Sequence, residues 1–416
     1  MGGPRVQVVV HAGNHSGIAP SLAKERLESR GRAILRAFRM RLITHQMARD
    51  LLRSKLVPNP RTQGPIVWRH SPLAAAALAY STAHPDRFAK WFFLTNYQKF
   101  VVLSALLELP AVVRCEDGCI ATRPDALIIL IYRLANEGSW EKLMEHGVFC
   151  GLGASWSPTK ARSVFRAVSR EMHRLHGARA TWSKAIMGRH AHYGPPAHAV
   201  MSAPLAAYFA QLGYVVPFWM DGTRRSKARQ LPSWDGTDMQ QKDWNAWWHG
   251  HNSLYVTVSA PSGEIGACSG PHFGHTNDQG AVNASGFVGA LQTLPPNVKC
   301  AVDDGFANGA GGPAGFPLVG KVPGGPFSAN GADPRGRHDA ATSSHRNTVE
   351  LPHGCLVQTF PCLNLVANRI KVNTTNCLNC RNAIVLYNCL LCTKNAHVIV
   401  SRMFDCEPMD IADCSR

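Results

Sequence analysis

Apolar residues recur at helical spacing between residues 84 and 177. The run 87–109 is predicted to be helical as far as Pro110, because proline cannot extend the interior of a helix. The run 123–138 has Pro124 near its start and a glycine at its end, which are signals for the start and the end of a helix. The pattern therefore predicts an all-helical domain in this part of the chain.

Two shorter helical runs, 139–149 and 157–177, follow with a glycine-containing turn between them. Ser157 and Pro158 are a typical N-cap and first helical residue. The pair is predicted to be helix-turn-helix-like and to bind DNA, and the alternative is an ordinary helical pair with solvated arginines. The second helix carries a predicted apolar stripe, formed by Ala161, Val164, Phe165 and Val168, and four candidate DNA contacts on its polar faces, namely Lys160, Arg162, Arg166 and Arg170.

From Tyr214 onward the composition becomes typical of strands. A Pro-Ser-Gly turn at 261–263 separates two apolar runs, which predicts a hairpin. Residues 307–339 are too rich in Gly and Pro for regular elements and are predicted to form a long loop. Helical composition resumes near Ser343 and continues with interruptions to about Cys392. The three segments with strand-like composition are 214–223, 253–270 and 297–306.

Positive charge is distributed over the whole chain. Lys and Arg total 44 against 27 Asp and Glu, and the net charge is +17. Residues 1–60 carry +8 and the remainder carries +9, so a basic tail does not account for all of it. This balance is typical of a protein that binds a polyanion. Residues 1–75 are interpreted as a basic, disordered arm, in which residues 24–56 could instead form a basic amphipathic helix that contacts DNA.

The chain contains no run of about 18 apolar residues, and its first residues lack the pattern of a secretory signal. We therefore expect a soluble intracellular protein with no membrane partner. Thirteen cysteines are an odd count, which in a chain of this kind favours free thiols over a disulfide framework.

Three acidic residues stand at predicted ends of elements. Asp221 and Asp303 each terminate an apolar strand, and Glu350 lies near the start of a helix. Carboxylates on rigid elements are the hard ligands that Mg²⁺ or Mn²⁺ prefers. Two such cations polarise an attacking water and stabilise a leaving 3′-oxygen, which is what hydrolysis of a phosphodiester bond requires. Either aspartate alone is weak support, because Asp followed by Gly is more often a turn signal.

The residues around these carboxylates form an ordered set of motifs. A strand ends in Asp-Gly-Thr at Asp221, and the segment GPHFGHTND, which ends at Asp278, follows it. Asp303 stands in Asp-Asp-Gly-Phe, and a Ser-x-x-Arg-x-x-x-Glu motif ends at Glu350. This order of motifs, over roughly residues 85–395, resembles the Harbinger-type transposases, which are DDE superfamily endonucleases.

The resemblance implies a fold of the α/β class. An RNase H-like nuclease domain, with a mixed sheet flanked by helices, is expected over residues 200–395. The all-helical, helix-turn-helix-like domain at 84–177 would precede it, and a tail at 396–416 would follow.

The resemblance also implies a function. Asp221, Asp303 and Glu350 would be the catalytic residues and metal ligands of an endonuclease or transposase that hydrolyses DNA phosphodiester bonds with two divalent cations, Mg²⁺ or Mn²⁺. The family register selects Asp303 over Asp304, whose side chain is expected to point away from the site. Nuclear and cytoplasmic localisation and a separate Myb-like accessory protein are implied in the same way, and an oligomer is compatible with the sequence.

Several residues depart from the family pattern. The segment 247–254 (WWHGHNSL) replaces one that carries Lys and Arg, Phe306 replaces a tyrosine, and His353 replaces a phenylalanine. Pro352 closely follows Glu350 and is tolerable only where a helix begins. These departures keep an alternative open, a transposase-derived DNA-binding protein whose catalytic site has decayed. The survival of all three carboxylates favours the nuclease.

Other clusters indicate different chemistry. Cys377, Cys380, Cys389 and Cys392 form two Cys-x-x-Cys pairs that resemble a four-thiolate zinc site, and the preferred interpretation is that they are buried in an apolar helix. A group of histidines suggests a metal cluster, although satisfied or exposed histidines are the usual outcome. A group of tryptophans could stack on exposed bases, although core packing is the default. These residues are His249, His251, His272 and His275, and Trp234, Trp244, Trp247 and Trp248.

Overall fold

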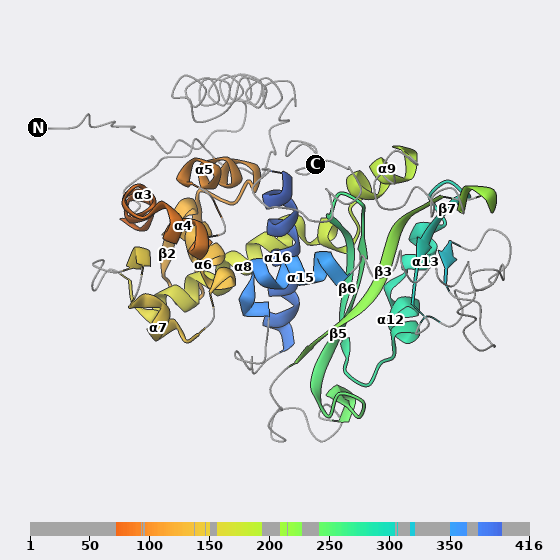
Figure 1. Cartoon of the computed structure of the whole chain (residues 1–416). Coiled ribbons are helices and arrows are strands. Elements are labelled where there is room, and N and C mark those ends of the chain that lie inside the picture. The colour runs from red at the N-terminus through yellow and green to blue at the C-terminus, as the bar shows by residue number, and fades with distance from the viewer. Residues whose placement is uncertain are drawn as a thin grey trace, which may run out of the picture.

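The computed structural model of the chain describes most of residues 72–392 (Figure 1). The first described helix begins at Pro72, inside the segment expected to form the basic arm. The arm up to residue 71, most of the segment 307–339 and the tail from 396 lie outside the described residues. The described ranges are 72–92, 94, 96–136, 138–145, 147–149, 156–193, 209–213, 215–226, 241–303, 306, 317–320, 350–363 and 373–392.

A group of helices forms the amino-terminal part of the described chain. At its centre lies α6, which begins as the sequence predicts, because Thr122 Oγ1 accepts a hydrogen bond from the Asp125 backbone N–H at 3.4 Å and Pro124 occupies the first turn. Nearly every side chain of α6 is buried, so the other helices pack around it. These helices are α3 (Pro72–Ala83), α4 (Pro85–Phe92), α5 (Tyr97–Leu106), α6 (Arg123–Ala135), α7 (Trp140–Met144) and α8 (Pro158–Thr181).

The predicted run 87–109 is divided between α4 and α5. Asn96 caps a new helix, since its side chain accepts a hydrogen bond from the Lys99 backbone N–H at 3.1 Å. A residue that caps a helix has non-helical backbone angles and so interrupts a continuous run.

A two-stranded hairpin corrects the prediction of an all-helical domain. β1 (Val112–Arg114) pairs antiparallel with β2 (Ile120–Thr122). Gly118 turns the chain between them with φ 81°, a conformation that glycine adopts without strain. Runs of three residues are too short to show the periodicity of a strand, which is why the pattern does not reveal them.

The helix α8 is 24 residues long and links the helical region to the sheet. Its predicted apolar stripe is confirmed, because all four side chains are buried. The stripe packs on α6 near the start of the helix, and further along α8 lies against β6 and α16. Its predicted partner is shorter than the run 139–149, since α7 has five residues and is followed by the 3-10 turn Gly147–Phe149.

Among the described residues the sheet is mixed and contains six strands. β3 pairs with β5 antiparallel and with β7 parallel, while β6 continues the sheet beyond β5 and β8 continues it beyond β7. The predicted hairpin around 261–263 is confirmed as β5 and β6. This mixed sheet flanked by helices is consistent with an RNase H-like domain. Its strands are β3 (Val215–Ser226), β4 (Trp244–Asn245), β5 (Gly250–Ser259), β6 (Ile265–Phe273), β7 (Val298–Ala301) and β8 (Leu318–Val319).

The strand β8 corrects the prediction of a structureless loop at 307–339. Two residues of this segment pair parallel with β7, and the Val302 backbone N–H donates to the Val319 carbonyl at 2.9 Å. A strand of two residues among many Gly and Pro residues is too short to change the local composition, so the sequence pattern does not predict it. Only the neighbouring strand determines that these residues are extended.

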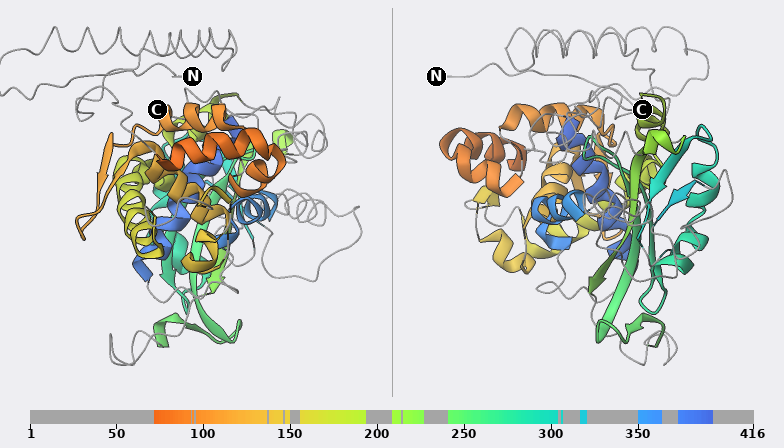
Figure 2. Two further views of the ribbon diagram at one scale, coloured as in Figure 1. Left: turned by 90° about the vertical axis from the view of Figure 1, so that its left-hand side faces the viewer. Right: turned by 45° about the vertical axis from the view of Figure 1, so that its right-hand side comes forward.

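Helices cover both faces of the sheet (Figure 2). Successive residues of a strand point to opposite faces, and Trp219 accordingly packs in the core shared with α8 and α16, while Phe218 and Met220 pack in the core shared with α9, α12 and α13. The first core also contains Leu73 and Ile128, so the helical region and one face of the sheet are packed together. The remaining helices are α9 (Lys184–Tyr193), α12 (Asp278–Ser285), α13 (Phe287–Leu291), α15 (Glu350–Thr359) and α16 (Asn373–Cys392), with a 3-10 turn at Pro361–Leu363.

The described part of α15 runs from Glu350 to Thr359 and contains Pro352. The residues just before Glu350 lie outside the described ranges, so the expectation that a helix begins close to Pro352 stays a prediction. None of the helices that the structure describes combines the length and the apolar character needed to cross a membrane.

Candidate active site

Asp221 lies within β3, opposite Thr257 of β5. The expectation that Asp221 ends its strand is corrected, because the polar residues that follow continue to pair with β5 as far as Ser226. Side chains two residues apart share a face, so Asp221 faces the same side of the sheet as Trp219, beneath α8 and α16. Asp221 is half-buried, and its Oδ1 accepts a hydrogen bond from the Gly222 backbone N–H at 2.8 Å.

Asp303 follows β7, the parallel neighbour of β3. Trp219 pairs with Ala301, and each aspartate stands two residues further along its own segment. Asp221 on β3 and Asp303 just beyond β7 therefore occupy corresponding positions of neighbouring segments, and both are half-buried. The Phe306 backbone N–H donates to the Asp303 carbonyl at 3.0 Å.

Glu350 is the first described residue of α15 and is exposed. One turn later on the same side of the helix, His353 Nε2 is hydrogen-bonded to Thr257 Oγ1. Because Thr257 is the strand partner of Asp221, this contact ties the start of α15 to the level of Asp221 on the sheet. Burial, and after it the charge of Arg225, lowers the pKa of His353 to about 3, so this histidine is neutral near pH 7.

The donor set fits a hard cation in kind, because carboxylate oxygens are the ligands of Mg²⁺ and Mn²⁺. Within the described residues, no three His, Cys, Asp or Glu side chains stand close enough together to hold a metal ion. The convergence of Asp221, Asp303 and Glu350 within metal-bridging distance stays a prediction. Asp304, expected to point away from the site, lies outside the described residues.

An arginine on β3 clamps the segment that precedes α12. Arg224 donates hydrogen bonds to the carbonyls of Gly274 at 2.8 Å and Thr276 at 3.0 Å. Its Nη2 also lies 3.8 Å from Oδ1 of Asp278, the first residue of α12. A Cβ on Gly222 would stand 2.7 Å from that same Oδ1, so only glycine leaves room for Asp278 there.

Asp278 adds a negative group to the surroundings of Asp303. Burial is the largest influence and raises the pKa of Asp278, while Arg224 lowers it and Asp303 raises it. The sequence motifs assign no role to Asp278 or Arg224. The signal that could have identified the pair is the Asp-Gly-Thr-Arg segment, which places an arginine three residues after Asp221 on a strand whose glycine allows close approach.

Replacing Arg224 with methionine is expected to destabilise the fold by about 2–4 kcal/mol, because a buried acceptor that loses its donor costs about 1–3 kcal/mol. Chemical denaturation of the full chain measures this loss. Arg87→Met, at an exposed position on α4, is the matched control and should change stability by less than about 0.5 kcal/mol. Equal denaturation midpoints for the two variants would show that Arg224 is not a structural clamp.

Comparison with known proteins finds a family similarity for part of this chain. Residues 226–393 match the family model of the DDE superfamily endonucleases. The match supports the DDE transposase superfamily for this region, which contains Asp303 and Glu350 and begins just after Asp221. A search of curated proteins and a search of solved structures each found no match.

The DDE match suggests a metal-dependent nuclease or transposase-like role and implies DNA as the substrate. DDE nucleases generally use divalent metals. The matched segment covers β4 to α16, and so it includes the elements that carry two of the three predicted carboxylates.

The zinc alternative does not fit the fold. The two Cys-x-x-Cys pairs lie on one continuous helix, α16, and Cys380 and Cys389 are nine residues apart on it. At 1.5 Å per residue they are separated by about 14 Å along the helix axis, whereas two thiolates on one zinc each lie about 2.3 Å from it. Both side chains are buried, as expected for cysteines of an apolar helix.

The histidines of this group form ordinary hydrogen bonds or are exposed to solvent. His272 Nε2 lies 2.9 Å from Ser269 Oγ, and His275 Nδ1 donates to the Lys242 carbonyl at 2.6 Å. His249 is exposed on a turn. The interpretation of these residues as a metal cluster has no support among the described residues.

The described tryptophans of the group are partly or largely exposed, whereas the sequence predicts that they pack in the core. Trp247 is 86% exposed, Trp248 63% and Trp244 43%. Trp234 lies outside the described residues. Packing against the described residues therefore does not explain these exposed indoles.

The candidate DNA contacts of α8 lie on its outer side, and two of them already have acidic partners. Arg162 Nη2 is 3.4 Å from Glu141, and Arg170 forms an ion pair with Glu116. All four side chains concerned are solvent-exposed, so these pairs contribute little to stability. Contact of this helix with DNA stays a prediction for Lys160, Arg162, Arg166 and Arg170.

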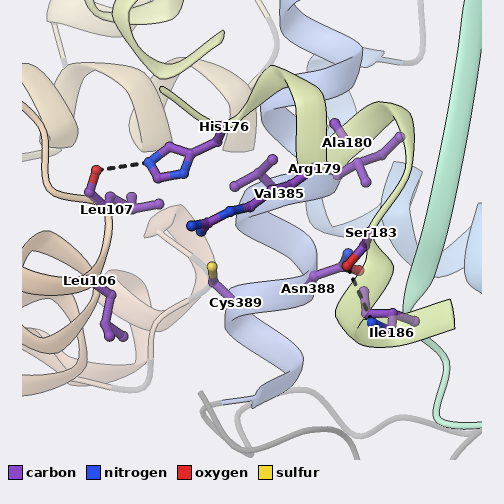
Figure 3. Close-up of a pocket in the computed structure, with 11 residues that line it drawn as sticks. Leu106, Leu107, His176, Arg179, Ala180, Ser183, Ile186, Val385, Asn388 and Cys389 are labelled. Carbon is purple, nitrogen blue, oxygen red and sulfur yellow. Dashed lines mark hydrogen bonds between the residues drawn. The ribbon is translucent and has the colours of Figure 1, made fainter. Parts of the chain in front are cut away.

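A pocket opens where α5 ends against α8, α9 and α16 (Figure 3). His176 Nε2 donates to the Leu107 carbonyl at 2.8 Å, and burial lowers the pKa of His176 to about 4. The pocket has no acidic residue in its lining and is therefore no candidate for the metal centre. Its lining residues are Leu106, Leu107, His176, Arg179, Ala180, Ser183, Ile186, Ile384, Val385, Asn388 and Cys389.

Proposed function

We propose that this protein is a metal-dependent DNA endonuclease of the Harbinger-type DDE transposases, with Asp221, Asp303 and Glu350 as its catalytic carboxylates and metal ligands. One observation supports the proposal: Asp221 lies on β3 and Asp303 follows its parallel neighbour β7, while His353, three residues after Glu350, is bonded to Thr257, the strand partner of Asp221.

Each carboxylate has a distinct part in this proposal. Asp221 and Asp303, on the rigid sheet, would be the fixed ligands, and Glu350 would close the site from the helix. Two divalent cations bound there would supply charge that activates water and stabilises the leaving 3′-oxygen. The protein itself would hold the scissile phosphate in line with the attacking water, which is largely a matter of positioning.

A specific observation favours a second candidate, a transposase-derived DNA-binding protein whose catalytic site has decayed. Phe306 and His353, which replace a tyrosine and a phenylalanine of the family pattern, stand three residues after Asp303 and Glu350 respectively. Incubation of the purified full chain with supercoiled DNA, with and without Mg²⁺ or Mn²⁺, distinguishes the two. Metal-dependent nicking supports the nuclease, and binding without cleavage under every metal supports the decayed protein.

Nuclear localisation and a Myb-like accessory protein are part of the same proposal and follow from the Harbinger-type resemblance alone. The net charge of +17 supports a nucleic-acid partner.

The basic face of α8 is proposed to contact phosphates. The double variant Lys160→Ala and Arg166→Ala should lower the slope of log affinity against log salt concentration by about 1.8, since each lost phosphate contact lowers it by about 0.9. The control, Arg162→Ala with Arg170→Ala, should lower it less, because Glu141 and Glu116 already engage these arginines. An unchanged slope in the first variant leaves only the interpretation of a solvated helix.

A further inference from the structure

The turn between β4 and β5 exposes a group of aromatic side chains. Trp247 and Trp248, on the turn itself, are 86% and 63% exposed, and Trp244 and Phe273 beside it are 43% and 41% exposed. Large apolar side chains are ordinarily buried, so an exposed group of them marks an interaction surface. These four residues are called the aromatic tip.

The backbone beneath the aromatic tip is firmly held. Asn245 accepts a hydrogen bond from the Trp248 backbone N–H at 2.9 Å and donates one to the Gly274 carbonyl at 2.7 Å. The same carbonyl accepts from Arg224 at 2.8 Å. A Cβ on Gly274 would lie 2.1 Å from the Asp243 carbonyl oxygen, which shows how closely the two segments approach. The indoles are therefore presented on a fixed platform, which lowers the entropy lost on binding.

The charge around the aromatic tip suits an anionic partner. In the described residues 241–252 and 270–276 the one acidic side chain is Asp243, which is fully buried. Lys242 lies on the surface with its Nζ 5.8 Å from the ring centre of Phe273. The exposed surface here thus combines aromatic faces with a cation and has no described carboxylate to repel a phosphate.

The aromatic tip lies at the lower end of β5 in Figure 1, on the strand that also passes Asp221. Seven residues separate Gly250, beside the tip, from Thr257, the strand partner of Asp221. At 3.3–3.4 Å per residue this is about 23 Å. A DNA duplex rises 3.4 Å per base pair. On a duplex that lies along β5, the tip would therefore meet the DNA about seven base pairs from the phosphate at Asp221.

We propose that the aromatic tip binds DNA by stacking Trp247 and Trp248 on unpaired or unstacked bases, about seven base pairs from the cleavage position. The proposal rests on the proposed function, because it takes DNA as the partner. Stacking on indoles tolerates every base sequence, since each base has a π-face. The tip therefore holds an opened region of the DNA and reads no sequence.

The test compares the full-length wild type with the double variant Trp247→Ala and Trp248→Ala. The control, Val112→Ala with Ile120→Ala, removes two exposed apolar side chains from the β1–β2 hairpin. Fluorescence anisotropy measures the affinity for a 20-nucleotide oligothymidylate and for a 20-base-pair duplex at two salt concentrations. The tip variant should bind the single strand about tenfold or more weakly, with an unchanged salt slope because no charge is lost. The duplex should be affected less, and the control variant should behave as wild type.

Trp247→Phe with Trp248→Phe should restore most of the single-strand affinity, because a phenyl ring also stacks. Equal single-strand affinity of the alanine variant and wild type overturns the proposal while leaving the nuclease function standing. Wild type that binds neither probe overturns both. A sedimentation coefficient that changes in the alanine variant while DNA affinity stays constant assigns the tip to protein contacts instead and also overturns the proposal.

Discussion

Asp221→Asn abolishes metal-dependent nicking of DNA and leaves DNA binding unchanged or slightly stronger, if Asp221 is a metal ligand as proposed. The substitution preserves the shape of the side chain and removes its charge. Cations in such a site contribute several kcal/mol to the transition state, so the rate should fall by about 10³-fold or more. Without metal the carboxylates repel phosphate, and the loss of one negative charge therefore does not weaken association.

The measurement combines a nicking assay with Mg²⁺ and an electrophoretic binding assay on the same preparations. Asp117→Asn is the matched control, because Asp117 is an exposed aspartate on the turn of the β1–β2 hairpin. It should nick at the wild-type rate. Wild-type nicking by Asp221→Asn would remove this residue from the site, and equal loss of nicking in both variants would point to a general effect of charge.

A second large effect concerns stability at acid pH. His353 and His176 are buried, and burial lowers their pKa values to about 3 and about 4. In the unfolded chain a histidine has a pKa of about 6.5. Below that pH the unfolded state binds protons that the folded state does not, so stability is complete above about pH 6.5 and decreases as the pH falls towards 4. Each histidine should cost about 1.4 kcal/mol per pH unit in this window.

Over two pH units the two histidines together amount to about 5 kcal/mol, which is comparable to the whole stability of many domains. Denaturation curves at pH 7.5, 6.5, 5.5 and 4.5 measure the slope. His353→Gln should reduce the pH dependence by about half, whereas His84→Gln, at an exposed position, should leave it unchanged. Stability that is constant between pH 6.5 and 4.5 would contradict the assignment of these histidines as buried and neutral.

Local patterns in the sequence determine much of this fold. The N-cap and proline signals place α6 and the start of α8, and the periodicity of α8 identifies four of its buried residues, because capping and amphipathic spacing act within a few turns of one helix. The Pro-Ser-Gly turn likewise places the β5–β6 hairpin. The short strands β1, β2 and β8 are not predicted by local patterns, because their stability comes from pairing with a neighbouring strand.

For the candidate site as well, the sequence determines some features and the tertiary structure determines others. The motifs single out Asp221, Asp303 and Glu350 by residue type and spacing, which are properties of the chain alone. Only the pairing of β3 with β7 makes the segments of the two aspartates neighbours, and only the contact between His353 and Thr257 ties α15 to the strand partner of Asp221.

The surroundings of the site are decided by tertiary structure as well. Arg224 reaches Asp278 across 54 residues of sequence because β3 and the segment before α12 are packed together. The exposure of Trp247 likewise depends on a turn that projects from the sheet, where no other described element covers it. Composition alone favours a buried tryptophan, because hydrophobic side chains are ordinarily buried. Trp247 is exposed instead, and the physical reason is the position of its turn in the fold.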